Sequence, residues 1–344
     1  MATSLSLGAL GVFLAVWGNP ENSGICVSCF LENSAGALGL HGNTRMQYLR
    51  PELLGFVLGA FASAMAFREF RTRGGGTPLA HLTAGVFLIV GCAVFIGCPI
   101  KLFLRLGAGD LTAVLGAAGL VAGVWTGLRG LGAGVQAGPA VAQKGGGGFF
   151  VPALFALLLV LLLARPAFLI FSDQGSAAQH APMLVSLGAG LGLGILAQRS
   201  RFCITGGLRD AFILGRRSPL FWGLVAFAGA ALIANLATER FSPGLYGQPG
   251  AHLDHLWSFL GMALVGWISV LIGGCPFRQL IRAGEGNTDA GLTVIGMLLG
   301  GALVQSWDLA ATAAGVPVYG KAAVLAGFAF VLLKSLVLRE RVPA

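Results

Sequence analysis

The segment Gly274-Cys275-Pro276-Phe277-Arg278 closely resembles an earlier segment, Gly97-Cys98-Pro99-Ile100-Lys101, which lies 177 residues before it. The match continues with Arg105, Gly107 and Gly109 in the first copy and Arg282, Gly284 and Gly286 in the second. Cys26 and Cys203 are separated by the same 177 residues. Matches that share one offset indicate an internal duplication. We therefore expect two repeats, residues 1–172 and 173–344, within one membrane domain.

The composition indicates a membrane protein. Of the 344 residues, 56% are hydrophobic and only 10% are charged, whereas a soluble domain has about 25% charged residues. The 55 glycines suit helices that pack closely in lipid. The net charge of +9 comes from short loops between apolar runs, with no basic patch interleaved with aromatic residues. We expect the lipid bilayer, and no nucleic acid, as a partner.

Ten apolar stretches predict an all-α, polytopic membrane helix bundle of about ten segments. They are residues 5–17, 53–67, 79–96, 111–128 and 149–171, then 183–196, 220–236, 256–272, 291–305 and 322–337. Between the first and second stretch of each repeat lie residues 22–40 and 199–214, which are too short and polar to cross alone. We expect re-entrant half-helices there, because irregular backbone at membrane depth persists only inside protein or beside a cavity.

An odd number of segments in each repeat predicts that the second repeat has the opposite orientation, as in many transporters. Basic residues lie on alternate connections, as the positive-inside rule requires. They are Arg68, Arg71, Arg73, Arg129, Lys144, Arg199, Arg201, Arg209, Arg216, Arg217, Arg278, Arg282, Arg339 and Arg341. We expect a multi-pass protein of the bacterial inner membrane with both termini in the cytoplasm. Cys26 and Cys98 would then be reached from outside, and Cys203 and Cys275 from inside.

The Gly-Cys-Pro motif predicts a cysteine at the start of a helix, because proline is favoured in the first turn and glycine permits close approach. A helix N-terminus favours anions and stabilises a thiolate. Basic residues follow each cysteine after three and seven residues, on the same helical face. They are Lys101 and Arg105 in the first repeat and Arg278 and Arg282 in the second. This arrangement suits a soft, anionic ligand.

The other cysteines and charges permit simpler interpretations. Cys92 has no counterpart and is expected only to pack. Cys29 forms a lone C-x-x-C with Cys26, which fits packing or thiol exchange, but no second pair completes a zinc site. We expect no metal, no cofactor and no catalytic residue. The acidic residues expected to neutralise nearby arginines are Asp110, Glu285 and Asp289.

A family resemblance rests on residues 274–289, together with Arg201-Phe202-Cys203 and Leu208-Arg209-Asp210. These segments resemble the YeeE/YedE family of membrane proteins. Asn19-Pro20, Cys26-Val27-Ser28-Cys29-Phe30 and the residues 36–41 are similar to the selenium-transporter branch of that family. The resemblance extends over nearly the whole chain.

The resemblance implies import of a small sulfur or selenium compound. In the branch that carries thiosulfate, the substrate passes along cysteines of the pore through weak contacts with the thiols. The matching positions here are Cys26, Cys98, Cys203 and Cys275. Pro276 and Arg278 depart from that branch, which leaves thiosulfate itself open. The family also implies a small cytoplasmic sulfur-carrier protein as a partner.

We therefore expect a transporter that moves a small sulfur- or selenium-containing anion along a central, cysteine-lined path. The candidate pathway residues are Cys26, Cys29, Cys98, Cys203, Cys275, Lys101, Arg105, Arg201, Arg278 and Arg282. The alternative is a membrane thiol-disulfide or sulfur-transfer enzyme that uses Cys26 with Cys29. A third possibility is a structural subunit whose cysteines only pack.

Overall fold

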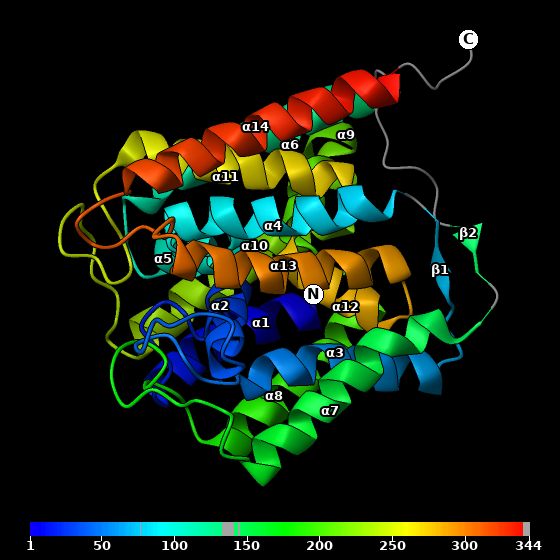
Figure 1. Ribbon diagram of the computed structural model, residues 1–344. Helices are drawn as coiled ribbons and strands as arrows, with labels where there is room; N and C mark the ends of the chain where they lie inside the picture. The colour runs from blue at the N-terminus through cyan, green and yellow to red at the C-terminus, as the bar shows by residue number, and fades with distance from the viewer. Residues whose placement is uncertain (76, 133–140, 144, 340–344) are drawn as a thin grey trace.

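The computed structural model describes residues 1–75, 77–132, 141–143 and 145–339 (Figure 1). Among the loop charges noted above, Lys144 and Arg341 lie outside these residues. The described chain is a bundle of helices, with one short antiparallel pair of strands, β1 (Arg73–Gly74) and β2 (Val141–Ala142).

Ten apolar helices form the body of the bundle, which confirms the predicted fold class. Eight helical segments of the described chain are long and apolar enough to cross a membrane, and two further apolar helices, Ala2–Val16 and Pro51–Ala66, are shorter. The ten helices are α1 (Ala2–Val16), α3 (Pro51–Ala66), α4 (Pro78–Phe95), α6 (Ala113–Gly132), α7 (Phe150–Ala164), α8 (Met183–Ser200), α10 (Pro219–Ala237), α11 (His255–Leu271), α13 (Thr288–Ser306) and α14 (Val318–Arg339). Each overlaps one of the ten predicted stretches.

Four short helices lie among the long ones. They are α2 (Val27–Ala37), α5 (Pro99–Gly107), α9 (Ile204–Ile213) and α12 (Pro276–Gly284). At about 1.5 Å of rise per residue, helices of this length reach only part of the way across a bilayer. Two 3-10 turns, η1 (Gly146–Phe149) and η2 (Gly215–Arg217), precede α7 and α10. Helices α2 and α9 fall within the two stretches predicted to be re-entrant.

The long helices of the two halves pack against each other in matching pairs. Helix α1 lies beside α10 and α3 beside α8, while α4 lies beside α13 and α6 beside α11. The short helices follow the same pattern, because α5 packs on α10 and α12 packs on α3. Helix α2 also contacts α12, and α5 contacts α9. The four short helices therefore lie between elements of both halves.

Small residues let the backbones of α3 and α8 approach closely. Gly55 and Gly59 on α3 meet Gly190 and Gly194 on α8, so each helix presents two glycines four residues apart. A Cβ atom on Gly55 would lie 2.6 Å from the backbone of Gly190, and one on Gly194 would lie 2.5 Å from the Phe56 carbonyl oxygen. In lipid, where the hydrophobic effect does not drive helices together, such small-residue faces allow the close van der Waals packing that does.

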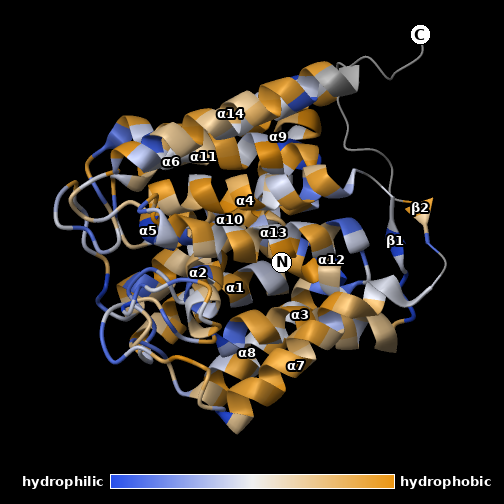
Figure 2. Cartoon of the chain, in the orientation of Figure 1, coloured by the Kyte–Doolittle hydropathy of each residue, from blue (hydrophilic) through white to orange (hydrophobic). Residues whose placement is uncertain are grey.

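The two ends of the bundle differ in charge. Thr3 Oγ1 donates to the Leu196 carbonyl at 3.1 Å, and Arg199 pairs with Glu69 at 2.8 Å, so the start of α1, the end of α8 and the α3–α4 connection lie together. We call this end the basic end, because its loops contain Arg68, Arg71, Arg73, Arg199, Arg201, Arg216 and Arg217. Figure 2 shows apolar residues along the helices and polar residues gathered in the loops at both ends.

Candidate functional site

Cys26, Cys98, Cys203 and Cys275 each occupy the residue immediately before a short helix. Their backbones are extended, and the helices α2, α5, α9 and α12 begin at the next residue. This confirms the helix N-terminal position predicted for Cys98 and Cys275, and it extends the pattern to the other two cysteines. All four thiols are free and at most 5% exposed.

At the start of α2, two cysteine thiols lie close together. Cys26 Sγ lies 2.7 Å from Cys29 Sγ and 3.4 Å from Ser28 Oγ. Both Cys26 and Cys98 are buried, whereas Cys29 is partly exposed.

The second pair places two cysteines side by side, with Cys203 Sγ 3.7 Å from Cys275 Sγ. The backbone N–H groups of Gly206 and Cys275 both point at Cys203 Sγ, at 3.3 and 3.5 Å. Thr205 Oγ1 lies 3.3 Å from the same sulfur. Donors at helix N-termini stabilise negative charge, so this site suits a thiolate or a bound anion.

A cavity of about 880 Å³ opens at the end opposite the basic end. We call it the Lys101 cavity. Its walls include Cys29, Glu32, Asn33, Arg45, Arg50, Lys101, Ser176, Gln179, Gln305 and Asp308. Lys101 is only 3% exposed, and none of the described carboxylates lies within 4.0 Å of its Nζ.

A second cavity of about 300 Å³ opens at the basic end. We call it the Arg282 cavity. Its walls include Arg201, Cys203, Thr205, Arg209, Ser269, Arg278 and Arg282. It therefore combines one of the four N-terminal cysteines with several cations.

The two cavities lie at opposite ends of the same helix. Gln179, shortly before α8, lines the Lys101 cavity, and Arg201, directly after α8, lines the Arg282 cavity. The 18 residues of α8 correspond to about 27 Å at about 1.5 Å per residue, close to the roughly 30 Å of a bilayer core. Cys26, Cys98 and Cys275 are at most 1% exposed and line neither cavity.

The glycine of the Gly-Cys-Pro motif makes room for the cation that follows it. A Cβ atom on Gly97 would lie 2.6 Å from the Lys101 side chain, and one on Gly274 would lie 2.8 Å from that of Arg278. Long side chains on a helix lean toward its N-terminus. The glycine thus allows the aliphatic part of each cation to lie beside the cysteine.

Two of the predicted cations are neutralised by carboxylates. Arg105 Nε donates to Asp110 Oδ2 at 2.6 Å, and its other nitrogens donate to the Phe95 carbonyl and to Thr112 Oγ1. Arg105 is 1% exposed and lines neither cavity, so its place on the pathway stays a prediction. Arg278 pairs with Glu285 at 3.1 Å, although it does line the Arg282 cavity. The predicted neutralising roles of Asp110 and Glu285 are confirmed.

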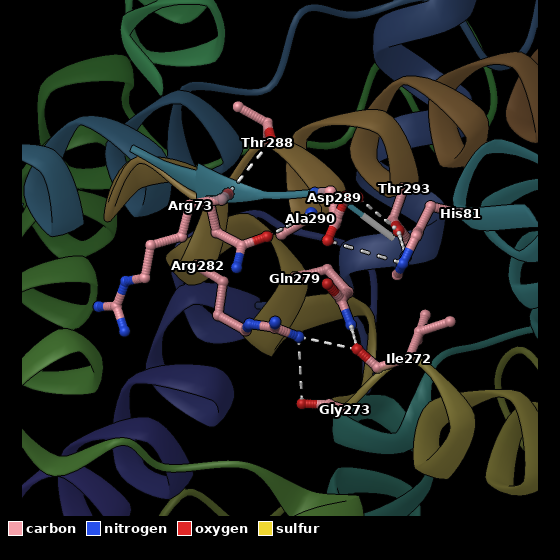
Figure 3. A network of polar contacts seen from close by, with 12 residues as sticks. Arg73, His81, Ile272, Gly273, Gln279, Arg282, Thr288, Asp289, Ala290 and Thr293 are labelled. Atoms are coloured by element: carbon pink, nitrogen blue, oxygen red, sulfur yellow. Dashed lines mark hydrogen bonds and ion pairs between the residues drawn. The ribbon is translucent and has the colours of Figure 1, made fainter. Parts of the chain in front are cut away.

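Arg282 differs, because backbone carbonyls hold it. Its Nη1 donates to the Ile272 carbonyl oxygen at 2.7 Å and lies 3.4 Å from that of Gly273 (Figure 3). None of the described carboxylates lies within 4.0 Å of this guanidinium. The prediction that Asp289 neutralises an arginine was wrong, since Asp289 faces His81 at 3.9 Å across the α4–α13 contact (Figure 3).

Arg201 lies at the mouth of the Arg282 cavity, with its side chain 59% exposed and 3.7 Å from Glu69. Glu69 also accepts from Gln198 at 2.7 Å and pairs with Arg199. The hydrogen bond from Gln198 and the nearby arginines hold the pKa of the Glu69 carboxyl below its usual range. The Glu69 carboxyl group beside this cavity is therefore charged at neutral pH.

Sequence reasoning missed two buried charges in the Lys101 cavity, Arg50 and Glu32. Arg50 is fully buried, donates to Asn33 Oδ1 at 2.9 Å and to the Ser176 carbonyl at 2.8 Å, and faces the rings of Phe30 and Tyr48. A signal for Glu32 was present, because an ionisable residue within a predicted re-entrant stretch is a functional candidate by default.

Comparison with known proteins agrees with this architecture. A family described as Sulphur transport matches residues 199–332, which contain Cys203 and Cys275. The Probable transporter YedE of Salmonella typhimurium is 30% identical over 137 residues, which cover 38% of this chain and 32% of that protein. The Thiosulfate transporter TsuA of Escherichia coli is 29% identical over 124 residues, which cover 36% of this chain and 34% of that protein.

The Probable transporter YedE of Escherichia coli is 29% identical over 124 residues, which cover 35% of this chain and 29% of that protein. The chain thus spans about a third of the length of the relatives it matches. The family match, the YedE and TsuA relatives and the multi-pass helical bundle all support the resemblance noted from the cysteine motifs. Residues 199–332 are thus similar to the sulphur transport family, in agreement with the YeeE/YedE resemblance of the cysteine motifs.

Proposed function

We propose that this protein is a membrane transporter that imports a small sulfur- or selenium-containing anion. The proposal rests on the two cavities at opposite ends of the bundle. Each cavity combines a cysteine with a cation that has no carboxylate partner among the described residues: Cys29 with Lys101, and Cys203 with Arg282. A thiol is a soft group and a cation attracts an anion, so each cavity suits a small anion that contains a soft atom.

The central path between the cavities is formed by residues that line neither of them. Cys26, Cys98 and Cys275 lie behind the cavity walls at the starts of three short helices. The substrate passes between the cavities by contact with these thiols and with the donors at the helix N-termini. Soft contacts between sulfur atoms, or between sulfur and selenium, are weak enough for the substrate to leave each site.

The two halves, residues 1–172 and 173–344, act as inverted repeats. This interpretation is supported by the odd number of apolar segments in each half and by the matching helix pairs, such as α4 with α13 and α6 with α11. Inverted repeats place binding sites near the bilayer midplane at the interface between the repeats, where the four short helices meet.

The basic end faces the cytoplasm of a bacterial inner membrane. The positive-inside rule supports this orientation, because arginines gather in the connections at that end. Both termini then lie in the cytoplasm. A small sulfur-carrier protein at this end would receive the substrate beside the Arg282 cavity.

Uptake into proteoliposomes tests the proposal. Thiosulfate, sulfite, selenite and selenide are each supplied outside, and initial uptake by the wild-type protein is compared with that of a variant in which Cys26, Cys98, Cys203 and Cys275 are alanine. We expect uptake of at least one of these species by the wild-type protein and none by the variant. Full uptake by the variant, or no uptake by the wild-type protein, would contradict the proposal.

One observation favours a second function, a thiol-disulfide or sulfur-transfer enzyme. The sulfur atoms of Cys26 and Cys29 lie 2.7 Å apart, close enough to exchange bonds with a substrate sulfur. An exchanging pair needs both sulfurs, so Cys29→Ala would then be as damaging as Cys26→Ala. Under the transport proposal, Cys29→Ala is the milder change. A mixed disulfide or persulfide trapped on either cysteine during turnover would favour the enzyme.

A further inference from the structure

Glu32 places a buried carboxyl group in the Lys101 cavity. It lies on α2 three residues after Cys29, so the two side chains share one helical face. The residue is only 5% exposed, yet it lines the cavity wall. An anion that reaches Cys29 therefore comes close to this carboxyl group.

The partners of Glu32 are neutral. Its Oε2 accepts from Gln305 Nε2 at 2.5 Å, and Gln305 Oε1 in turn accepts from Asn43 Nδ2 at 2.7 Å. The second bond orients the Gln305 amide so that its NH₂ group faces Glu32. No Lys, Arg or His nitrogen of the described chain lies within 4.0 Å of the Glu32 carboxyl oxygens.

The elements packed around α2 contribute other titratable side chains, most of which have partners of their own. The groups that line the same cavity are Glu21, Cys29, Arg45, Arg50, Lys101 and Asp308. Arg50 is bound to Asn33 and Ser176, while Glu52 at the start of α3 accepts from Asn19. His41 bonds the main-chain oxygen of Glu32, and Cys92 on α4 and Cys26 are buried thiols. Lys101 and Arg50 are thus the buried cations of this cavity, and Arg50 is already held by Asn33 and Ser176.

An ionised carboxylate in this position opposes anion binding. Burial of a charge without a counter-charge is costly, and two negative groups in one low-dielectric cavity repel each other strongly. Protonation of Glu32 removes this repulsion, so that the positive charge of Lys101 attracts the anion without opposition. Because coupling between two binding equilibria is reciprocal, a proton on Glu32 and an anion in the cavity must each favour the other.

We infer that anion binding in the Lys101 cavity takes up one proton, which is held on the Glu32 carboxyl group. The inference rests on the proposed function and adds to it a pH-linked entry step. The proton comes from hydronium or a buffer acid of the outside medium, which becomes its conjugate base. One O–H bond forms on the Glu32 carboxylate as the bond between the proton and its donor breaks. An acidic medium outside the cell therefore favours loading of the cavity.

Thiosulfate is a suitable probe, because it remains a dianion from weakly acidic to weakly basic pH. Its dissociation constant is measured for the purified full chain in detergent between about pH 6 and about pH 10, a range wide enough for a buried carboxyl group to ionise. Proton uptake is measured in weakly buffered solution over the same range. A one-proton linkage weakens binding by at most about tenfold per pH unit on the alkaline side. We expect this weakening in the wild-type protein and a nearly flat profile in Glu32→Gln, which preserves the shape of the side chain.

Asp308→Asn is the matched control, because Asp308 is an exposed carboxylate of the same cavity. It should retain the pH dependence and the proton uptake of the wild-type protein. Gln305→Leu is an independent variant. Loss of the amide donor favours the protonated acid, so the alkaline weakening should begin at a higher pH.

A pH-independent dissociation constant in the wild-type protein, or an unchanged pH profile in Glu32→Gln, would overturn the inference. Neither result affects the proposed function, provided that the wild-type protein still binds and transports the anion. If thiosulfate does not bind, the same measurements with selenite are corrected for its own titration. Failure of every anion to bind the wild-type protein would overturn both.

Discussion

The two halves contain the same pair of cations but neutralise different members of it. In the first half, Arg105 forms a buried ion pair with Asp110, while Lys101 has no carboxylate within 4.0 Å among the described residues. In the second half, the equivalent of Lys101 is Arg278, which pairs with Glu285. The equivalent of Arg105 is Arg282, which has no carboxylate within 4.0 Å in the part of the chain that the structure describes. Each half thus keeps one cation available to its cavity, at a different position of the short helix.

The reason lies in two residues that differ between the halves. Asn287 occupies the position equivalent to Asp110, and Ala108 occupies the position equivalent to Glu285. The backbone contact is nonetheless the same, because Arg105 Nη1 donates to the Phe95 carbonyl at 3.0 Å and Arg282 Nη1 to the equivalent Ile272 carbonyl at 2.7 Å. One scaffold therefore supports two charge patterns.

The largest expected effect is on stability. Arg105→Gln leaves Asp110 buried and unpaired, and loss of one member of a buried ion pair costs about 3–5 kcal/mol. The matched change in the other half, Arg282→Gln, removes hydrogen bonds to carbonyls that are partly exposed and should cost about 1.5 kcal/mol or less. Thermal unfolding in detergent measures both. The double variant Arg105→Gln/Asp110→Asn should recover part of the loss, and equal losses in the two halves would contradict the comparison.

A smaller effect is expected on apparent affinity. Lys101→Gln and Arg282→Gln each remove a cation that has no carboxylate partner among the residues the structure describes. Each change should raise the KM for uptake about tenfold, which corresponds to about 1.4 kcal/mol. Arg278→Gln should have a smaller effect, since Glu285 already compensates its charge. Arg217→Ala is the control, because Arg217 lines neither cavity. A larger increase for Arg278→Gln than for Lys101→Gln would show that the ion pair opens to the substrate.

The smallest effect is expected at Cys92. This fully buried residue of α4 corresponds to Ser269 in the second half, so one half of the molecule already uses serine at the position. Cys92→Ser should leave uptake unchanged and cost about 1 kcal/mol of stability at most. Cys98→Ser should abolish uptake, because a hydroxyl is a hard and strongly hydrated group. Similar losses in the two variants would indicate that both cysteines serve packing.

The sequence alone determined most of the helical framework. Apolar stretches of sufficient length must form helices in lipid, since every backbone N–H and C=O group needs an internal partner there. The Gly-Cys-Pro motifs likewise predicted Cys98 and Cys275 at helix starts, because proline and glycine act through local backbone geometry. These features depend on residues that are neighbours in the chain, so the sequence is enough to predict them.

Only the tertiary structure decided which charged groups face a cavity. Arg105 and Arg282 occupy equivalent places on their helices, and local spacing predicted the same role for both, yet one is enclosed by an ion pair and the other lines a cavity. Glu32 is buried by Gln305, which is 273 residues away in the chain. Burial and charge pairing arise where distant segments meet, and no local pattern specifies those contacts.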